Sequence, residues 1–225
     1  MDADPLDFDA VILAGGRSAR LGGVPKQELK YDGETLLRRS VAAAGGARAV
    51  VVVGPDAGET PAGTLSCREE PPFGGPAAAI AAGLAALEKA EGSRPPLTLV
   101  LACDMPKVRQ AVAALREGLL AAGPAAGRDG VVAVSEDGRR QPLVGFYSTA
   151  ALQRSAAELA ASGDLVNASV RVLLASLDVK PVAVPAGSTA DVDTWDDAAT
   201  LGVAGPGPIG EFRSKAAADD LGGRA

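Results

Sequence analysis

The feature that most constrains this chain is a glycine-rich, basic loop that directly follows an apolar run near the amino end. The apolar run, residues 10–13, is typical of a buried strand. Residues 13–26 follow as Leu-Ala-Gly-Gly-Arg-Ser-Ala-Arg-Leu-Gly-Gly-Val-Pro-Lys. Glycines let several backbone N–H groups converge on one anion, and Arg17, Arg20 and Lys26 add mobile positive charge. The combination predicts a triphosphate-binding site.

Two familiar phosphate motifs do not describe this loop. A Walker loop is excluded because no Gly-Lys-Ser/Thr follows at the required spacing. A dinucleotide fingerprint is a poor fit, because Gly15, Gly16, Gly22 and Gly23 do not match Gly-x-Gly-x-x-Gly and Pro25 is a poor start for a long helix. The alternative to a phosphate site is an ordinary basic surface loop. We favour the phosphate site because loops this rich in Gly and Arg after a first strand usually serve phosphates.

Apolar runs and helical patterns alternate along the rest of the chain. Strands are predicted at residues 10–13, 49–53, 65–67, 97–103, 130–134, 141–147 and 179–184. Helices are predicted at residues 35–44, 76–91, 108–122, 150–161 and 168–177, with Thr194 as the N-cap of a closing helix. Most strand runs are continuously apolar, which indicates burial on both faces of a parallel sheet. The pattern predicts an α/β fold with three layers, α/β/α, around a mostly parallel central sheet.

Length and charge limit the classes of protein to consider. The 225 residues suffice for one well-buried α/β domain, which we place at residues 1–202. Residues 203–225 are rich in Gly, Pro and Ala and are expected to form a disordered tail. The net charge of −6 argues against a nucleic-acid or anionic-membrane surface. A basic loop in an acidic chain therefore indicates a focused anion site.

The chemistry available to the chain is limited by what its sequence lacks. It contains no histidine, which removes His-based triads, most zinc sites and the usual general base. The two cysteines, Cys67 and Cys103, end predicted strands and are expected to be reduced core residues. No apolar stretch is long enough for a membrane span and no signal-peptide start is evident, so we expect a cytoplasmic protein.

An aspartate follows the predicted strand at residues 97–103. Asp104 should lie at the carboxyl edge of the sheet, where the loop after Leu13 also opens. A carboxylate facing phosphates requires a cation between them, and Mg²⁺ held by carboxylates and phosphate oxygens is the usual arrangement. The alternative is that Asp104 caps the next helix, although a cap would more naturally sit immediately before Pro106. We favour Mg²⁺ binding by Asp104.

Two further acidic segments are candidates for the same site. Asp191 and Asp193 alternate with an apolar residue, so they share one face of an extended segment, and one of them can complete the magnesium shell. We take Asp193 as the second Mg²⁺ ligand, and whether Asp191 takes that place instead is left open. Glu69 and Glu70 precede a Gly-Gly-Pro turn before a helix. Either carboxylate can accept hydrogen bonds from a guanine edge, or lie in a solvated turn, and we favour Glu70 for the guanine contact.

Taken in order, these motifs resemble the molybdenum cofactor guanylyltransferase family, within the Rossmann-like nucleotidyltransferases. The matching segments are Leu-Ala-Gly-Gly-x-x-x-Arg-Leu-Gly…Lys, Gly75-Pro76, Cys103-Asp104-x-Pro, Gln141-Pro142-Leu143-x-x-x-Tyr147 and Asp193-Thr194, across residues 8–202. The resemblance implies that Leu13, Ala14 and Gly15 lie along the nucleotide, and the glycine-rich loop itself adds Gly16 to the binding residues. It also implies that Lys26 binds phosphates, that Asp104 ligates Mg²⁺, and that Glu70 contacts guanine.

The expected reaction is the transfer of GMP from GTP to a phosphorylated acceptor, molybdopterin, with release of pyrophosphate. An acceptor phosphate is already ionised at neutral pH, so the lack of histidine is no obstacle. Arg20 and Lys26 would stabilise the developing negative charge and Asp104 would hold the metal ion. The expected partners are these small molecules, together with transient contacts to other proteins of cofactor biosynthesis.

Three alternatives remain at this point. Pro25-Lys26-Gln27 is typical of cytidylyl- and sugar-nucleotide transferases, and Gly54 stands where a polar base contact is expected, so the base is open. A non-catalytic nucleotide-binding homologue would keep the fold and release no pyrophosphate. An NAD(P)-dependent oxidoreductase needs an acidic ribose contact after the second strand, where only Asp56 is offered, beyond a proline.

Overall fold

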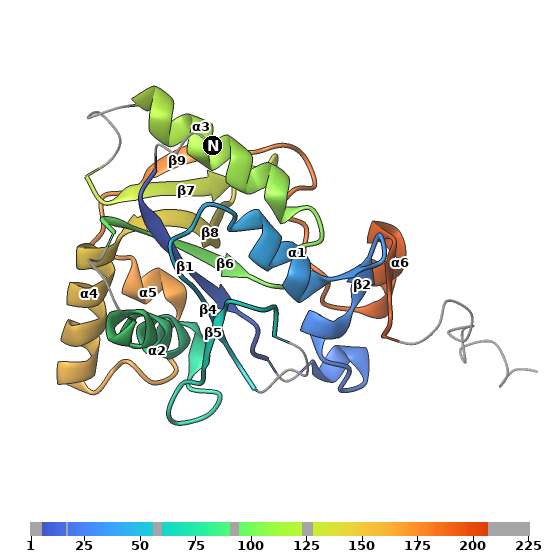
Figure 1. Cartoon of the computed structure of the whole chain (residues 1–225), viewed down its shortest axis with the longest axis horizontal. Helices are drawn as coiled ribbons and strands as arrows, with labels where there is room; N and C mark the ends of the chain where they lie inside the picture. Colours follow the sequence, from blue (N-terminus) through green and yellow to red (C-terminus); the bar gives the residue numbers. More distant parts are fainter. Residues whose placement is uncertain (1–5, 17, 56–59, 91–94, 123–127, 207–225) are drawn as a thin grey trace, which may run out of the picture.

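A seven-stranded sheet forms the centre of the protein, as seen in the computed structural model (Figure 1). The structure describes residues 6–16, 18–55, 60–90, 95–122 and 128–206. In spatial order the strands are β5 (Leu65–Cys67), β4 (Val50–Val53), β1 (Phe8–Leu13), β6 (Leu97–Ala102), β8 (Arg140–Ser148), β7 (Gly130–Val134) and β9 (Lys180–Ala183). Only β8 runs antiparallel to its neighbours, β6 and β7. The predicted mostly parallel sheet is confirmed.

Helices cover both faces of this sheet (Figure 1). On one face lie α1 (Leu36–Ala43) and α3 (Val108–Ala122), and on the other lie α2 (Gly75–Lys89), α4 (Thr149–Ser162) and α5 (Val170–Leu173). Alternate residues of β1 enter the two cores: Phe8 and Ile12 pack with α1 and α3, whereas Val11 packs with α2 and α4. Every residue of β1 is therefore buried, which is why residues 10–13 are apolar at every position.

A second, smaller sheet was not predicted. It has the order β10 (Val203–Ala204), β2 (Lys30–Tyr31) and β3 (Glu34–Thr35), and α6 (Trp195–Leu201) lies beside it (Figure 1). A separate apolar cluster that includes Leu29, Val192 and Ala198 fills this unit. Two-residue strands carry too little periodicity to be found in a sequence. The small unit joins residues near both ends of the described chain.

Most predicted element boundaries hold to within one or two residues, and two differences are worth noting. The helix expected at 168–177 spans only Val170–Leu173. Ser169 is its N-cap and Leu174 is its C-cap. Ordered structure also continues past residue 202, since Val203 pairs with Tyr31 of β2. Residues 207–225 of the expected tail lie outside the described residues. Among the helices that the structure does describe, none combines the length and apolar character needed to cross a membrane.

One buried carboxylate in this fold gives a testable pH dependence. Asp9, in β1, accepts a hydrogen bond from the Ala49 amide (3.0 Å) and lies 3.5 Å from an Arg48 nitrogen. Burial raises the pKa of Asp9 above its ordinary 3.8, although Arg48 and the Ala49 amide act in the opposite direction. The folded protein therefore holds this proton to higher pH than the unfolded chain, and the contribution of Asp9 to stability falls as pH rises through that window.

We expect Asp9→Asn to flatten this part of the pH–stability profile. Its melting temperature should exceed that of the wild type at pH 7, and the difference should vanish at pH values below the ordinary carboxyl pKa. Thermal unfolding from pH 3 to 7 measures this, with Asp164→Asn as the control at an exposed aspartate. A wild-type profile for Asp9→Asn would contradict the assignment.

Candidate nucleotide and metal site

Three strands of the large sheet end level with one another, and their loops form the candidate site. Leu13 pairs with Val53 on one side and with Ala102 on the other. The following loop is held at both sides: Ala14 N–H donates to the Val53 carbonyl (2.8 Å) and Cys103 N–H donates to the Leu13 carbonyl (3.0 Å). The predicted convergence of this loop with the Asp104 segment is therefore confirmed.

The backbone of the glycine-rich loop adopts positive φ at three of its glycines. Gly16, Gly22 and Gly23 have φ values of 140°, 66° and 85°, which residues other than glycine rarely adopt. Leu13 and Ala14 are buried, whereas Gly15 and Gly16 are exposed, so the loop presents its backbone to solvent at this edge. Arg17, which was expected to add charge here, lies outside the described residues.

Gly54 supports this loop from the neighbouring strand. A Cβ at residue 54 would lie 2.9 Å from the carbonyl carbon of Ala14 and 3.1 Å from the nitrogen of Gly15. The lack of a side chain lets the end of β4 pack flat against the loop backbone. The sequence suggested a base-contacting position here, and the structure supplies a different reason for glycine. The sequence signal for this packing role is a glycine directly after a buried strand.

We expect Gly54→Ala to displace the loop and to weaken nucleotide binding by about tenfold, because an ångström-scale shift of binding groups is costly. The measurements are the dissociation constant of the nucleoside triphosphate that the wild type binds most tightly, and the melting temperature. An unchanged nucleotide affinity would show that the loop tolerates the added methyl group and that Gly54 has no part in placing it.

Lys26 lies at the centre of the polar contacts. It begins the short helix η2 (Lys26–Glu28), and its Nζ donates to Asp104 Oδ2 at 3.0 Å and also to Asp193 Oδ1. Burial by itself would lower the pKa of Lys26, but the carboxylates of Asp104 and Asp193 outweigh it, so the pKa is raised. The lysine is thus held in its charged form, as phosphate binding requires.

Three carboxylates meet around this lysine. Asp104, Asp191 and Asp193 each offer an oxygen, and these oxygens lie within 4.8 Å of one another. The Val192 amide donates to the Asp104 carbonyl at 3.0 Å, which fixes the 191–193 segment beside the end of β6. Because Val192 is fully buried, the two aspartates on either side of it face the same way, as the alternation predicted.

The chemistry of this donor set suits Mg²⁺. Carboxylate oxygens are the ligands that Mg²⁺ prefers, and it usually binds one or two of them with substrate phosphates completing its shell. Burial and the nearby Asp104 raise the pKa of Asp191, which is the effect expected where carboxylates are crowded together. The structure therefore brings Asp191 into the cluster alongside the expected Asp104 and Asp193.

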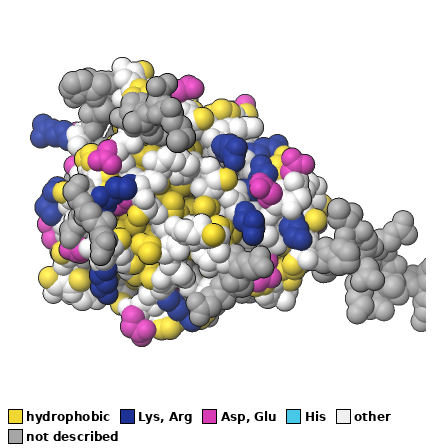
Figure 2. Space-filling view, viewed as in Figure 1, with side chains coloured by type: hydrophobic (Ala, Val, Ile, Leu, Met, Phe, Trp, Pro, Cys, Tyr) yellow, Lys and Arg dark blue, Asp and Glu magenta, His cyan; other side chains and the backbone are white. Residues whose placement is uncertain are grey.

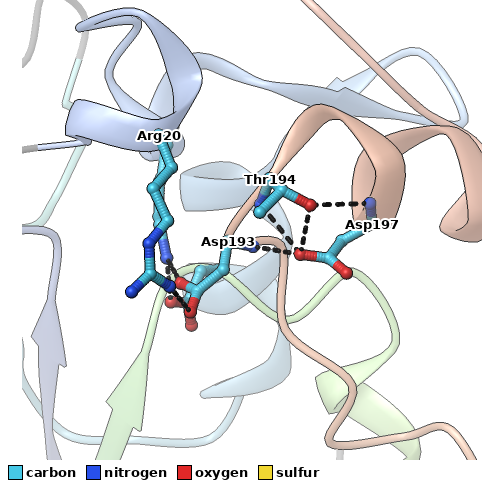
Figure 3. Close-up of polar contacts among 6 residues, drawn as sticks. Arg20, Asp193, Thr194 and Asp197 are labelled. Carbon is cyan, nitrogen blue, oxygen red and sulfur yellow. Dashed lines mark hydrogen bonds and ion pairs between the residues drawn. The ribbon is translucent and has the colours of Figure 1, made fainter.

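The start of α6 holds Asp193 in place (Figure 3). Thr194 and Asp197 form a capping box, and Asp197 Oδ2 accepts hydrogen bonds from the Asp193 amide (3.1 Å) and the Thr194 amide (2.8 Å). The hydrogen bond from the Thr194 hydroxyl is the largest of several that lower the pKa of Asp197. Asp197 thus stabilises the helix start, and Asp193 faces the lysine.

The other expected site residues lie further from this centre. Arg20 approaches Asp193 Oδ2 at 3.5 Å, and its side chain is 74% exposed, so it is free to move toward an anion (Figure 3). Glu70 is exposed on the segment between β5 and α2, and in the described part of the chain no hydrogen bond or ion pair joins it to the lysine cluster. Glu69 is buried and accepts a hydrogen bond from the Phe73 amide at 3.0 Å, so it is not a solvated residue.

The chain is similar to known nucleotidyltransferases. A curated molybdenum cofactor guanylyltransferase from Pseudomonas fluorescens is 32% identical over 112 residues, and the match covers 48% of this chain and 53%, about half, of that relative. Among solved structures, molybdopterin-guanine dinucleotide biosynthesis protein A from Archaeoglobus fulgidus has a TM-score of 0.59 at 20% identity, covering 86% of this chain and 96% of that one. The 2-C-methyl-D-erythritol 4-phosphate cytidylyltransferase from Thermus thermophilus has a TM-score of 0.58 at 22% identity, covering 87% and 97%.

These two structures share the fold of this protein at low sequence identity, so they support its architecture. The family model of the MobA-like NTP transferase domain matches residues 10–181, which include the glycine-rich loop, Lys26 and Asp104. That match spans most of the chain, and the chain therefore belongs to the MobA-like NTP transferase family.

Proposed function

We propose that this protein is a Mg²⁺-dependent nucleotidyltransferase that transfers GMP from GTP to molybdopterin and releases pyrophosphate. The observation that carries the proposal is the meeting of Lys26 with Asp104 and Asp193 beside the exposed backbone of Gly15 and Gly16. The half-length match to a molybdenum cofactor guanylyltransferase supports the choice of base and acceptor.

The reaction forms one bond and breaks one. An oxygen of the acceptor phosphate attacks the α-phosphorus of the nucleotide, and the bond between that phosphorus and the oxygen bridging to the β-phosphate breaks. The electron pair leaves with pyrophosphate. Because the attacking oxygen is already ionised at neutral pH, the chain needs no general base, in keeping with its lack of histidine.

Each residue of the site has its own role in the proposed reaction. Asp104 and Asp193, with Asp191 beside them, would hold Mg²⁺, which when bound neutralises charge on the phosphate oxygens. Lys26 and Arg20 stabilise the negative charge that builds up on the departing pyrophosphate, and the amides of Gly15 and Gly16 hold the triphosphate. Leu13 and Ala14 lie along the nucleoside, and Glu70 contacts the base. In this division the chain contributes positioning and electrostatic stabilisation.

A cytidylyltransferase is the second candidate. Pro25 stands before Lys26 and Gln27 follows it, a sequence typical of cytidylyl- and sugar-nucleotide transferases, and the Thermus thermophilus cytidylyltransferase shares the fold. The two candidates differ in both substrates, so one assay distinguishes them.

The test measures pyrophosphate release with Mg²⁺ and each of the four nucleoside triphosphates. Each is combined with molybdopterin or with 2-C-methyl-D-erythritol 4-phosphate. Release only with GTP and molybdopterin supports the proposal, whereas release with CTP supports the second candidate. Thermal shift identifies the bound nucleotide independently, because a ligand at 100 times its Kd stabilises by about 2.7 kcal/mol. Selective binding without pyrophosphate release would indicate a non-catalytic homologue.

A further inference from the structure

Arg39 connects separate segments next to the candidate site. It lies on α1 with 23% of its side chain exposed, and its Nε donates to the Pro106 carbonyl at 2.9 Å. One terminal nitrogen lies 3.5 Å from the Tyr31 carbonyl, and the guanidinium covers the Tyr31 ring with its carbon 4.6 Å from the centroid. Basic and acidic side chains lie close together over α1 and β2 in Figure 2.

The two carbonyls that Arg39 contacts belong to the two segments that carry the central ion pair. Pro106 follows Asp104 by two residues, in the turn after β6. Tyr31 lies in β2, which is joined to η2 and Lys26 through Leu29, whose amide donates to the Lys26 carbonyl at 3.1 Å. Arg39 thus ties the lysine segment to the aspartate turn.

Arginine suits this role for a geometric reason. Its guanidinium is planar and offers several donors in a fixed arrangement while stacking on an aromatic ring. Glu34, 3.7 Å from a terminal nitrogen, balances part of its charge. A cavity of about 160 Å³ borders the side chain, lined by Glu34, Arg39, Pro106 and Arg109, so a different side chain at position 39 has space.

We infer that Arg39 is a positioning residue for the proposed transfer, because it sets the placement of Asp104 relative to Lys26 and so the affinity of the carboxylate cluster for a divalent ion. This inference rests on the proposed function. Residues that orient metal ligands without touching the metal typically change metal affinity or activity by about 10–100-fold when replaced.

A purely structural role for Arg39 would have a different signature. Arg48 makes a comparable contact at the other end of the sheet, where its nitrogen lies 3.5 Å from Asp9 and 34% of its side chain is exposed. Replacing Arg48 removes a partly buried arginine from the same fold without touching the segments that carry Lys26 and Asp104. Arg48→Met is therefore the matched control for Arg39→Met.

The experiment compares wild type, Arg39→Met, Arg39→Lys and Arg48→Met. Mn²⁺ binding is measured by electron paramagnetic resonance, alongside the melting temperature without metal and the kcat and KM for nucleotide. For Arg39→Met we expect Mn²⁺ affinity and kcat to fall by about tenfold with little change in KM. Arg39→Lys should recover part of the affinity, because an ammonium can still donate to Pro106. Arg48→Met should keep wild-type Mn²⁺ affinity.

The outcomes separate the inference from the function on which it rests. If wild type binds Mn²⁺ and releases pyrophosphate while both Arg39 variants keep wild-type Mn²⁺ affinity, the positioning role is overturned and the proposed function stands. If wild type neither binds Mn²⁺ nor releases pyrophosphate, both fail together. Should Arg39→Met not fold, Arg39→Lys decides: an affinity lowered about threefold supports the role, and wild-type affinity overturns it.

Discussion

Replacing Asp104 with asparagine is expected to lower the rate of nucleotidyl transfer by about 10²–10³-fold, or about 3–4 kcal/mol in the barrier. The free energy of unfolding should change much less than the barrier. The effect on rate follows from the place of Asp104, which contacts Lys26 at 3.0 Å and lies with Asp191 and Asp193 in the candidate metal cluster.

The small effect on stability has its own cause. Asparagine keeps the shape of the side chain but loses the ion pair with Lys26, which destabilises the folded state. It also removes one of three carboxylates whose oxygens lie within 4.8 Å of one another, which relieves repulsion. These contributions oppose each other. Lys26 also keeps its contact with Asp193.

Lys26→Met should behave differently, because it leaves the three carboxylates without their central cation. We expect a loss of rate of about 10²-fold together with a lower melting temperature that Mg²⁺ restores. The assays are pyrophosphate release and thermal unfolding with and without Mg²⁺.

Asp196→Asn is the control for the Asp104→Asn variant, since Asp196 is exposed in the first turn of α6 and lies outside the cluster. Near-normal turnover by Asp104→Asn would remove Asp104 from the metal site.

The strands of the large sheet and the helices that cover it could be predicted because their sequence signals are local. A run such as residues 10–13 is apolar at every position since both faces of β1 are buried, and Thr35 and Thr194 mark helix starts by the hydrogen bonds that their side chains accept. The same local rules placed Asp104 at the carboxyl edge, beside the loop after Leu13. Because β1 and β6 pair and end level with each other, the Asp104 segment and the loop after Leu13 become neighbours in space.

What the sequence did not predict depends on contacts between distant segments. The small sheet joins residues 30–35 to 203–204, and no local pattern records that pairing. The backbone hydrogen bond from Val192 to Asp104, which fixes the 191–193 segment beside the end of β6, also joins distant residues. The contact of Arg39 with Pro106 joins residues 67 positions apart, and arginine on an exposed-looking helix face gives no signal for it. The contact of Glu70 with a base stays a prediction.

The largest expected effect on stability comes from a glycine far from the candidate site. Gly130 begins β7 opposite Tyr147 of β8, with φ at 123°. A Cβ at this position would lie 2.0 Å from the carbonyl oxygen of Phe146 and 3.0 Å from the Tyr147 Cα. These are backbone atoms in the interior of the sheet, where Phe146 and Tyr147 are fully buried, so neither can move without disturbing the pairing of β7 with β8.

Gly130→Ala should therefore lower the free energy of unfolding by about 3–5 kcal/mol, in the range caused by severe steric strain in a core. Gly138→Ala is the matched control, because Gly138 also has positive φ, 79°, but a Cβ there would meet no atom within 4 Å. The control bears only the conformational cost of a positive φ, about 1 kcal/mol. Denaturant unfolding of both variants measures the loss at residue 130 in excess of the control, which combines the clash with the less favourable φ of 123°. Equal losses for the two would mean that β7 and β8 separate easily and that residue 130 is glycine for its backbone angle alone.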